Sequence, residues 1–143
     1  MIELVVVVAI IGIIMAVSTP VFLSYWRTST LRAGAEELSA ILNGARMLAI
    51  KENTNVCVTN TGTAARYHVA PAACGGTAWT GVGTDSAGNF RLANNVAVTG
   101  GVNVTFTYLG AAAPAGTFTV TNPVDGRTMN VIVASTGRVR IGP

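Results

Sequence analysis

The stretch IELVVVVAIIGIIMAVSTPVF, residues 2–22, decides the fold of this chain. It is almost wholly apolar, and no side chain from Leu4 to Tyr25 carries a charge at neutral pH. A helix of about 20 such residues is long enough to cross the hydrocarbon core of a bilayer. The stretch therefore predicts a helix that can span a membrane, with one carboxylate, Glu3, near its start.

A cleavable signal peptide is the alternative interpretation of an apolar run near an N-terminus. Such a peptide carries a basic region first and a cleavage site of small residues afterwards. This run begins with an acid, and the first basic residue is Arg27. The pattern therefore favours a helix that is retained.

The composition also points to a membrane or to self-assembly. The chain has 143 residues, of which 50% are hydrophobic and only 10% are charged. An average soluble domain is roughly 25% charged, so much of this surface must be apolar, neutral or covered. The net charge of +3 is a mild excess that does not exclude acidic partners.

After Arg27 the apolar run becomes a helical period. Apolar residues recur at steps of three and four, at Leu31, Ala35, Leu38, Leu42, Ala45 and Ala49. This spacing is typical of an amphipathic helix with one buried stripe. We expect a single helix from about residue 2 to residue 52, roughly 75 Å long.

Two residue types should disturb that helix. Pro20 lacks an amide donor and clashes with the preceding turn, so a kink or a short unwound stretch is expected there. Gly12, Gly34 and Gly44 weaken the helix but permit close approach of another helix. Neighbouring helices are therefore expected to supply much of its stability.

Beyond Asn53, short alternating runs separated by Gly, Asn and Pro predict strands. The predicted strands are residues 55–59, 65–70, 90–92, 95–99, 102–109, 117–121, 128–135 and 138–141, and residues 71–89 are predicted to form a long loop. Asn60-Thr61-Gly62 and Asp125-Gly126 are signals for hairpin turns.

The predicted fold is α+β, a long N-terminal helix packed on a small, mostly antiparallel β head. Residues 1–26 would form the transmembrane or filament-core half of the helix. Residues 27–53 would continue it as an amphipathic helix, and residues 54–143 would form the head.

Cys57 and Cys74 form an even pair, which predicts a disulfide in an exported head. Such a bridge would tie the loop 71–89 to the first strand. The alternative is two buried free thiols. Neither cysteine has the spacing of a zinc or redox motif.

No catalytic site, metal or cofactor is expected from the remaining residues. His68 is the one histidine and lies on a predicted strand, where a structural role is typical. The six acidic residues fall on the helix, in a loop and in a turn, without a pair suited to acid–base catalysis. We therefore expect a protein that is not an enzyme.

Residues 2–22, with Glu3 at the head and Pro20 near the far end, resemble the N-terminal signature of type IV pilins and type II secretion pseudopilins. The mature helix of that family opens with an aromatic residue or Met, then Thr, Leu, Ile and Glu. Ile2, Glu3 and Leu4 match, and two residues of that opening are missing here. If Met1 is the mature terminus, Glu3 lies two residues nearer the amine than in the family pattern.

The rest of the chain resembles the pseudopilin H and FimT-like branch of this family. The matching stretches are LRAGAEELSAILNGARMLAIKENTNVCV, residues 31–58, and VIVASTGRVRI, residues 131–141. The resemblance implies a subunit that polymerises through its N-terminal helix, with copies of itself and other pilins, into a helical filament for adhesion, motility, secretion or DNA uptake.

The resemblance also implies where the subunit is found and what it meets. It would reside in the inner membrane before assembly and in an extracellular or periplasmic filament afterwards. Prepilin peptidase and the assembly platform are implied partners, and methylation is an implied modification. No cofactor is implied.

The family likeness gives Glu3 a role in filament assembly. Its carboxylate would pair with the N-terminal amine of its own or a neighbouring subunit, which offsets the cost of a charge in apolar surroundings. The alternative is an acid at the membrane interface. Gly12 would let neighbouring helices come close, and Pro20 of the same signature is the third residue expected to act in assembly.

Gly137-Arg138-Val139-Arg140 matches the GRxR pattern that some FimT-like minor pilins use to bind DNA. In a strand, Arg138 and Arg140 project to one face and could contact adjacent phosphates. Arg127, with Arg91 or Arg66, is a candidate to extend this patch. The alternative is that exposed arginines keep an edge strand soluble and unpaired.

Overall fold

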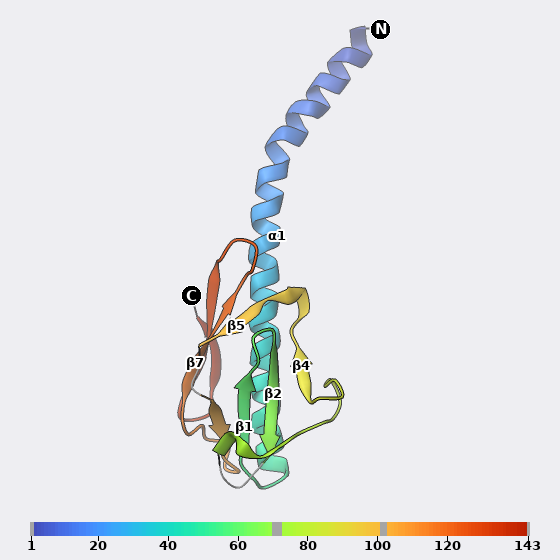
Figure 1. Ribbon diagram of the computed structural model, residues 1–143. Helices are drawn as coiled ribbons and strands as arrows, with labels where there is room; N and C mark the ends of the chain where they lie inside the picture. The colour runs from blue at the N-terminus through green and yellow to red at the C-terminus, as the bar shows by residue number, and fades with distance from the viewer. Residues whose placement is uncertain (1, 70–72, 101–102, 143) are drawn as a thin grey trace.

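In the computed structural model, residues 2–69, 73–100 and 103–142 are described. One long helix, α1 (Ile2–Lys51), lies with its C-terminal half along a β head, while its N-terminal half extends away from the head (Figure 1). The predicted α+β fold, with a long helix on an antiparallel head, is confirmed.

The strands of the head form two sheets rather than one. The first sheet has the order β3 (Thr77–Ala78), β2 (Ala64–Val69), β1 (Val56–Asn60), β6 (Val104–Phe106), and β4 (Asn89–Arg91) also pairs with β2. The second has the order β5 (Ala97–Thr99), β7 (Gly116–Thr121), β8 (Thr128–Val133), β9 (Val139–Gly142). All of these strand pairs are antiparallel. Two short 3₁₀ helices, η1 (Ala73–Gly75) and η2 (Ala93–Asn95), connect strands.

The apolar stripe of α1 is the centre of the core. All six residues of the predicted stripe are buried: Leu31, Ala35, Leu38, Leu42, Ala45 and Ala49. The helix packs on strands of both sheets, and the fully buried side chains that it meets include Phe106 and Phe118, one from each sheet. The helical period thus identified the packing face correctly.

Polar contacts fix the helix and the two sheets relative to one another. The Tyr67 hydroxyl donates to the carbonyl of Ile41, and burial raises the pKa of Tyr67 well above its ordinary value. The backbone N–H of Ala93 donates to Glu37 Oε2 over 2.8 Å, which holds η2 to α1. Asn60 of the first sheet donates to the carbonyl of Val98 in the second, at 3.2 Å.

The described part of the predicted loop 71–89, residues 73–89, contains regular structure that the sequence does not predict. It contains η1 and β3, and β4 begins at Asn89. β3 pairs Ala78 with His68 and Thr77 with Val69. A strand of two residues is too short to produce an alternating pattern, so the sequence could not reveal it.

The predicted strand 102–109 is shorter than expected. β6 ends at Phe106, and a turn follows in which Thr107 N–H donates to the carbonyl of Ala111 at 2.8 Å. Gly110 adopts a φ of 80° in this turn, which favours glycine. Residues 70 and 102, the ends of two predicted strands, lie outside the described residues.

Two of the three helix glycines have a different role from the one expected. Gly34 and Gly44 lie against Val96 and Tyr67 of the chain's own head, so they permit close approach of the head rather than of another helix. α1 is continuous through Pro20 without an unwound stretch, and it bends in its N-terminal half (Figure 1). The Thr19 hydroxyl donates to the carbonyl of Met15 at 2.7 Å, a bond that favours bending.

Cys57 and Cys74 form the predicted disulfide, with their Cα atoms 5.2 Å apart. Cys57 is buried in β1, and Cys74 lies in η1. The bridge therefore ties the irregular segment after β2 to the central strand of the first sheet.

Leucine at Gly34 should destabilise the head, whereas leucine at Gly12 should not. A Cβ at position 34 would lie 2.6 Å from Cγ2 of the buried Val96, and overpacking of this kind costs about 1–3 kcal/mol. A Cβ at position 12 meets nothing within 4 Å. Chemical unfolding of the full chain in a neutral detergent, monitored by tryptophan fluorescence, compares the two variants. Equal stabilities would contradict this packing.

Candidate assembly helix and basic motif

The N-terminal half of α1 presents an apolar surface with nothing packed on it. From Ile2 to Trp26, its large hydrophobic side chains are between 46% and 79% exposed. By length and composition, α1 is a helix that could cross a membrane, and its most apolar window is not buried inside the protein. An exposed apolar surface of this extent requires a lipid or protein partner.

Glu3 lies in the first turn of α1 and is exposed. The first turn of a helix carries unpaired N–H groups and the positive end of the helix dipole, both of which favour a carboxylate. The fold thus supplies a local reason for an acid here. Its pairing with an N-terminal amine stays a prediction, because Met1 lies outside the described residues.

Gly12 lies on the exposed helix, where a Cβ would meet open space. Ala9 and Ala16 are also exposed, so small residues are presented in the middle of the apolar surface. Such residues let helix backbones approach closely. Pro20 is the third residue predicted to act in assembly. α1 continues through it, and the N-terminal half of α1 is bent (Figure 1).

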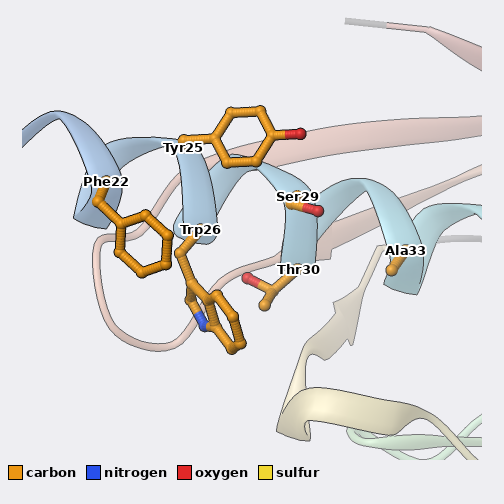
Figure 2. A pocket seen from close by; sticks show the side chains of 6 residues that line it. All are labelled: Phe22, Tyr25, Trp26, Ser29, Thr30 and Ala33. Carbon is orange, nitrogen blue, oxygen red and sulfur yellow. The ribbon is translucent and has the colours of Figure 1, made fainter.

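An aromatic cluster, Phe22, Tyr25 and Trp26, was missed by the sequence analysis. The three side chains are 60–73% exposed and line a hollow of about 370 Å³ with Ser29, Thr30 and Ala33. Phe22 and Trp26 project from one side of α1 with ring centroids 6.2 Å apart, and Tyr25 projects from another (Figure 2). The sequence does contain a signal for this cluster, because its aromatic residues come directly before the first basic residue, Arg27, as is typical of the end of a membrane span.

The basic motif lies on the edge strand of the second sheet. Val139 and Ile141 pair with Val133 and Val131, whose side chains are buried. Arg140 pairs with Ile132 and is therefore on the outer face. Arg138 and Arg140 are both exposed, and neither forms an ion pair among the described residues.

The glycine of this motif is required by the fold. Gly137 has a φ of 77°, and a Cβ there would collide with the carbonyl oxygen of Gly110. The same Cβ would lie 3.2 Å from Nε of Arg46. The glycine in GRxR therefore has a structural explanation that is independent of any ligand.

The structure does not bring the other three arginines to the motif. Arg127 is at the opposite end of β8, where its Nη1 donates to Thr28 Oγ1 at 2.8 Å and its Nε lies 3.4 Å from Asp125. Arg66 and Arg91 belong to the first sheet, and they contact Asn89 and Asp85 respectively. Hydrogen bonds from Asn89 lower the pKa of Asp85 to about 2.

His68 has structural partners on both ring nitrogens. Nε2 lies 3.2 Å from Thr59 Oγ1, and Nδ1 lies 3.0 Å from the carbonyl of Gly76. Within residues 2–69, 73–100 and 103–142, no group of three His, Cys, Asp or Glu side chains could hold a metal ion.

Comparison with known proteins extends these observations. The family described as "Type II transport protein GspH" matches residues 34–137, which cover most of the helix stripe and nearly all of the head. No curated protein matches the chain.

Two crystal structures of the type IV minor pilin FimU from Pseudomonas aeruginosa PAO1 share the fold. One is 19% identical, with a TM-score of 0.54 over 78% of this chain and 92% of that chain. The other is 20% identical, with a TM-score of 0.55 over 83% of this chain and 92% of that chain. The likeness extends to both the helix and the head.

Alanine at Gly137 should destabilise the head more than alanine at Gly126. Gly126 has a φ of 68° but open space around it, so alanine there costs only the left-handed strain of about 1–2 kcal/mol. At Gly137 the collision with Gly110 adds about 1–3 kcal/mol. Denaturant unfolding measures both, and Arg138→Ala should stay within about 0.5 kcal/mol of the natural chain. A Gly137→Ala variant as stable as Gly126→Ala would refute the structural explanation.

Proposed function

This chain belongs to the GspH family of type II transport proteins, and on that premise we propose that it polymerises through α1 into a filament of the type IV pilus kind. The subunit acts as a structural element and carries out no catalysis. Its contribution to adhesion, motility, secretion or DNA uptake is made through the filament.

The exposed apolar half of α1 is the observation that carries this proposal. In a bilayer that surface contacts lipid tails, and in a filament it contacts the same surface of other subunits. Both environments are apolar, so transfer between them involves little change in hydrophobic free energy. Packing between small residues around Gly12 then favours the filament.

Glu3 makes docking selective in this proposal. A carboxylate that enters an apolar filament core is costly unless it is paired. Pairing with the terminal amine of its own or a neighbouring subunit removes that cost. Addition of a subunit is then favoured where a terminal amine is available to Glu3.

The proposal also assigns locations and partners. The subunit is stored in the inner membrane, processed by prepilin peptidase and extracted by an assembly platform. It is then found in an extracellular or periplasmic filament with other pilins. Methylation accompanies processing in this proposal.

Leucine at Gly12 should reduce filament yield several-fold while membrane insertion is unchanged, because leucine separates packed helices but suits lipid. Cell fractionation measures insertion, and shearing of surface filaments measures assembly. Met15→Leu, on the same exposed surface, conserves volume and is the matched control. If Gly12→Leu lowers insertion and filament yield equally, the packing role of this surface is wrong.

A second candidate function is DNA binding by a minor pilin during natural transformation. The observation that favours it is the pair of exposed guanidinium groups at Arg138 and Arg140 on the outer side of an edge strand. Side chains two residues apart on a strand share a face, so both could contact one phosphate backbone. Arg127 is excluded from this site by its position beside Thr28.

Removal of both arginines tests this second function. The variant Arg138→Ala/Arg140→Ala should weaken binding of duplex DNA and lower the slope of log affinity against log salt by about 2, because two phosphate contacts are lost. Arg91→Ala, an exposed arginine of the other sheet, is the control. Gel shifts with the full chain in a neutral detergent provide the measurement. Binding that is absent, or unchanged in the double variant, would eliminate DNA as a ligand of this motif.

A further inference from the structure

The head begins on α1 almost where the apolar span ends. The uncharged segment from Leu4 to Tyr25 is about 33 Å long as a helix, close to the hydrocarbon thickness of a bilayer. Asn122 Nδ2 of the head donates to the carbonyl of Arg27 at 3.3 Å. The length of helix between the end of the span and this contact is about 3 Å.

The part of the head at this level is the turn between β7 and β8, residues 122–127. Figure 1 shows this turn beside α1 at the end of the head nearest the N-terminus. Arg127 Nη1 donates to Thr28 Oγ1 over 2.8 Å, so the turn is bonded to α1 through both of its ends.

The turn is held in a fixed shape by Asn122, which is 4% exposed. Its Oδ1 accepts from the N–H of Val124 at 2.9 Å, and its carbonyl accepts from the N–H of Gly126 at 3.0 Å. These bonds leave Val124 at the tip, with its side chain 72% exposed. An apolar side chain is thus presented at the depth where the span ends.

The aromatic cluster of Phe22, Tyr25 and Trp26 lies on α1 at the same level (Figure 2). Tyrosine and tryptophan concentrate at the membrane–water interface because their rings suit both phases. Arg27 is the next residue of α1 after Trp26. Arg127 of the turn lies beside Thr28, which is one residue further along the helix. The acid in the turn, Asp125, has a side chain only 11% exposed and is paired with Arg127.

We propose that before assembly the turn 122–127 and the aromatic cluster lie together in the headgroup layer of the bilayer, with phospholipid as their ligand. Val124 enters the boundary between headgroups and acyl chains, and Arg27 and Arg127 face lipid phosphates. The head therefore rests directly on the membrane in one orientation. This inference rests on the membrane storage in the proposed function, and it adds a second contact beyond the spanning helix.

A pair of exposed valines tests the orientation. Val124 lies at the turn beside Thr28, and Val82 lines a groove on the head whose α1 residues run from Gly44 to Lys51. Along α1, this groove begins about 24 Å from the level of Thr28. Because Cys57 and Cys74 are joined, a cysteine introduced at either valine is the one free thiol among the described residues.

The full chain, as Val124→Cys or Val82→Cys, is labelled with an environment-sensitive fluorophore and reconstituted into vesicles of phosphatidylethanolamine and phosphatidylglycerol. Addition of brominated phospholipid should quench the label at position 124 about twofold, since interfacial groups lie about 5–10 Å into the boundary layer. The label at position 82 should be unaffected. Pro123→Cys, another exposed position of the turn, repeats the test if Val124→Cys does not fold.

Carbonate extraction of the same vesicles separates this inference from its premise. If the vesicles retain the chain but the labels at positions 124 and 123 are not quenched, the contact between the turn and lipid is overturned, while membrane storage stands. Equal quenching at positions 124 and 82 would overturn the single orientation. A chain released by carbonate would overturn membrane storage and, with it, this inference.

Discussion

The packing of one helical stripe against two sheets is the interaction on which this molecule depends. The strands are two to six residues long, and each sheet has an apolar inner face that must be covered. Leu38 and Leu42, both 0% exposed, belong to the core cluster that α1 forms with strands of both sheets. Burial of a leucine contributes about 1.5–3 kcal/mol, so the stripe unites the two sheets into one core. The head cannot be separated energetically from the C-terminal half of α1.

The other half of the same helix has no such partner within the chain. α1 is continuous from Ile2 to Lys51, so one bent helix joins the apolar surface to the head. The charged residues resume at Arg27, whose carbonyl also accepts a hydrogen bond from Asn122 of the head.

Much of the fold could be predicted from the sequence, because long elements with a strong period are explicit in it. The stripe from Leu31 to Ala49 is such an element. The hairpin at Asp125-Gly126 was predicted from the residue types of its turn. The short strand β3 was missed because two residues show no alternation. The turn at Gly110 was missed because the alternating run 102–109 continues past Phe106, where β6 ends. At the candidate site, the exposed Arg138 and Arg140 followed from strand alternation. The contact of Gly137 with Gly110 joins residues far apart in the sequence, and no local pattern could report it.

The segment between Trp79 and Asn89 is fixed at both ends and by hydrogen bonds within it, such as that from the N–H of Thr84 to the carbonyl of Gly81 at 3.1 Å. The Cys57–Cys74 bridge holds the chain before it, and Arg66 holds Asn89 after it through a bond of 2.8 Å. Val82, in the middle, is 97% exposed. A substitution at Val82 should therefore leave the stripe and the sheets undisturbed. This exposed position is therefore free to vary, and it is where one filament architecture could acquire different surface specificities.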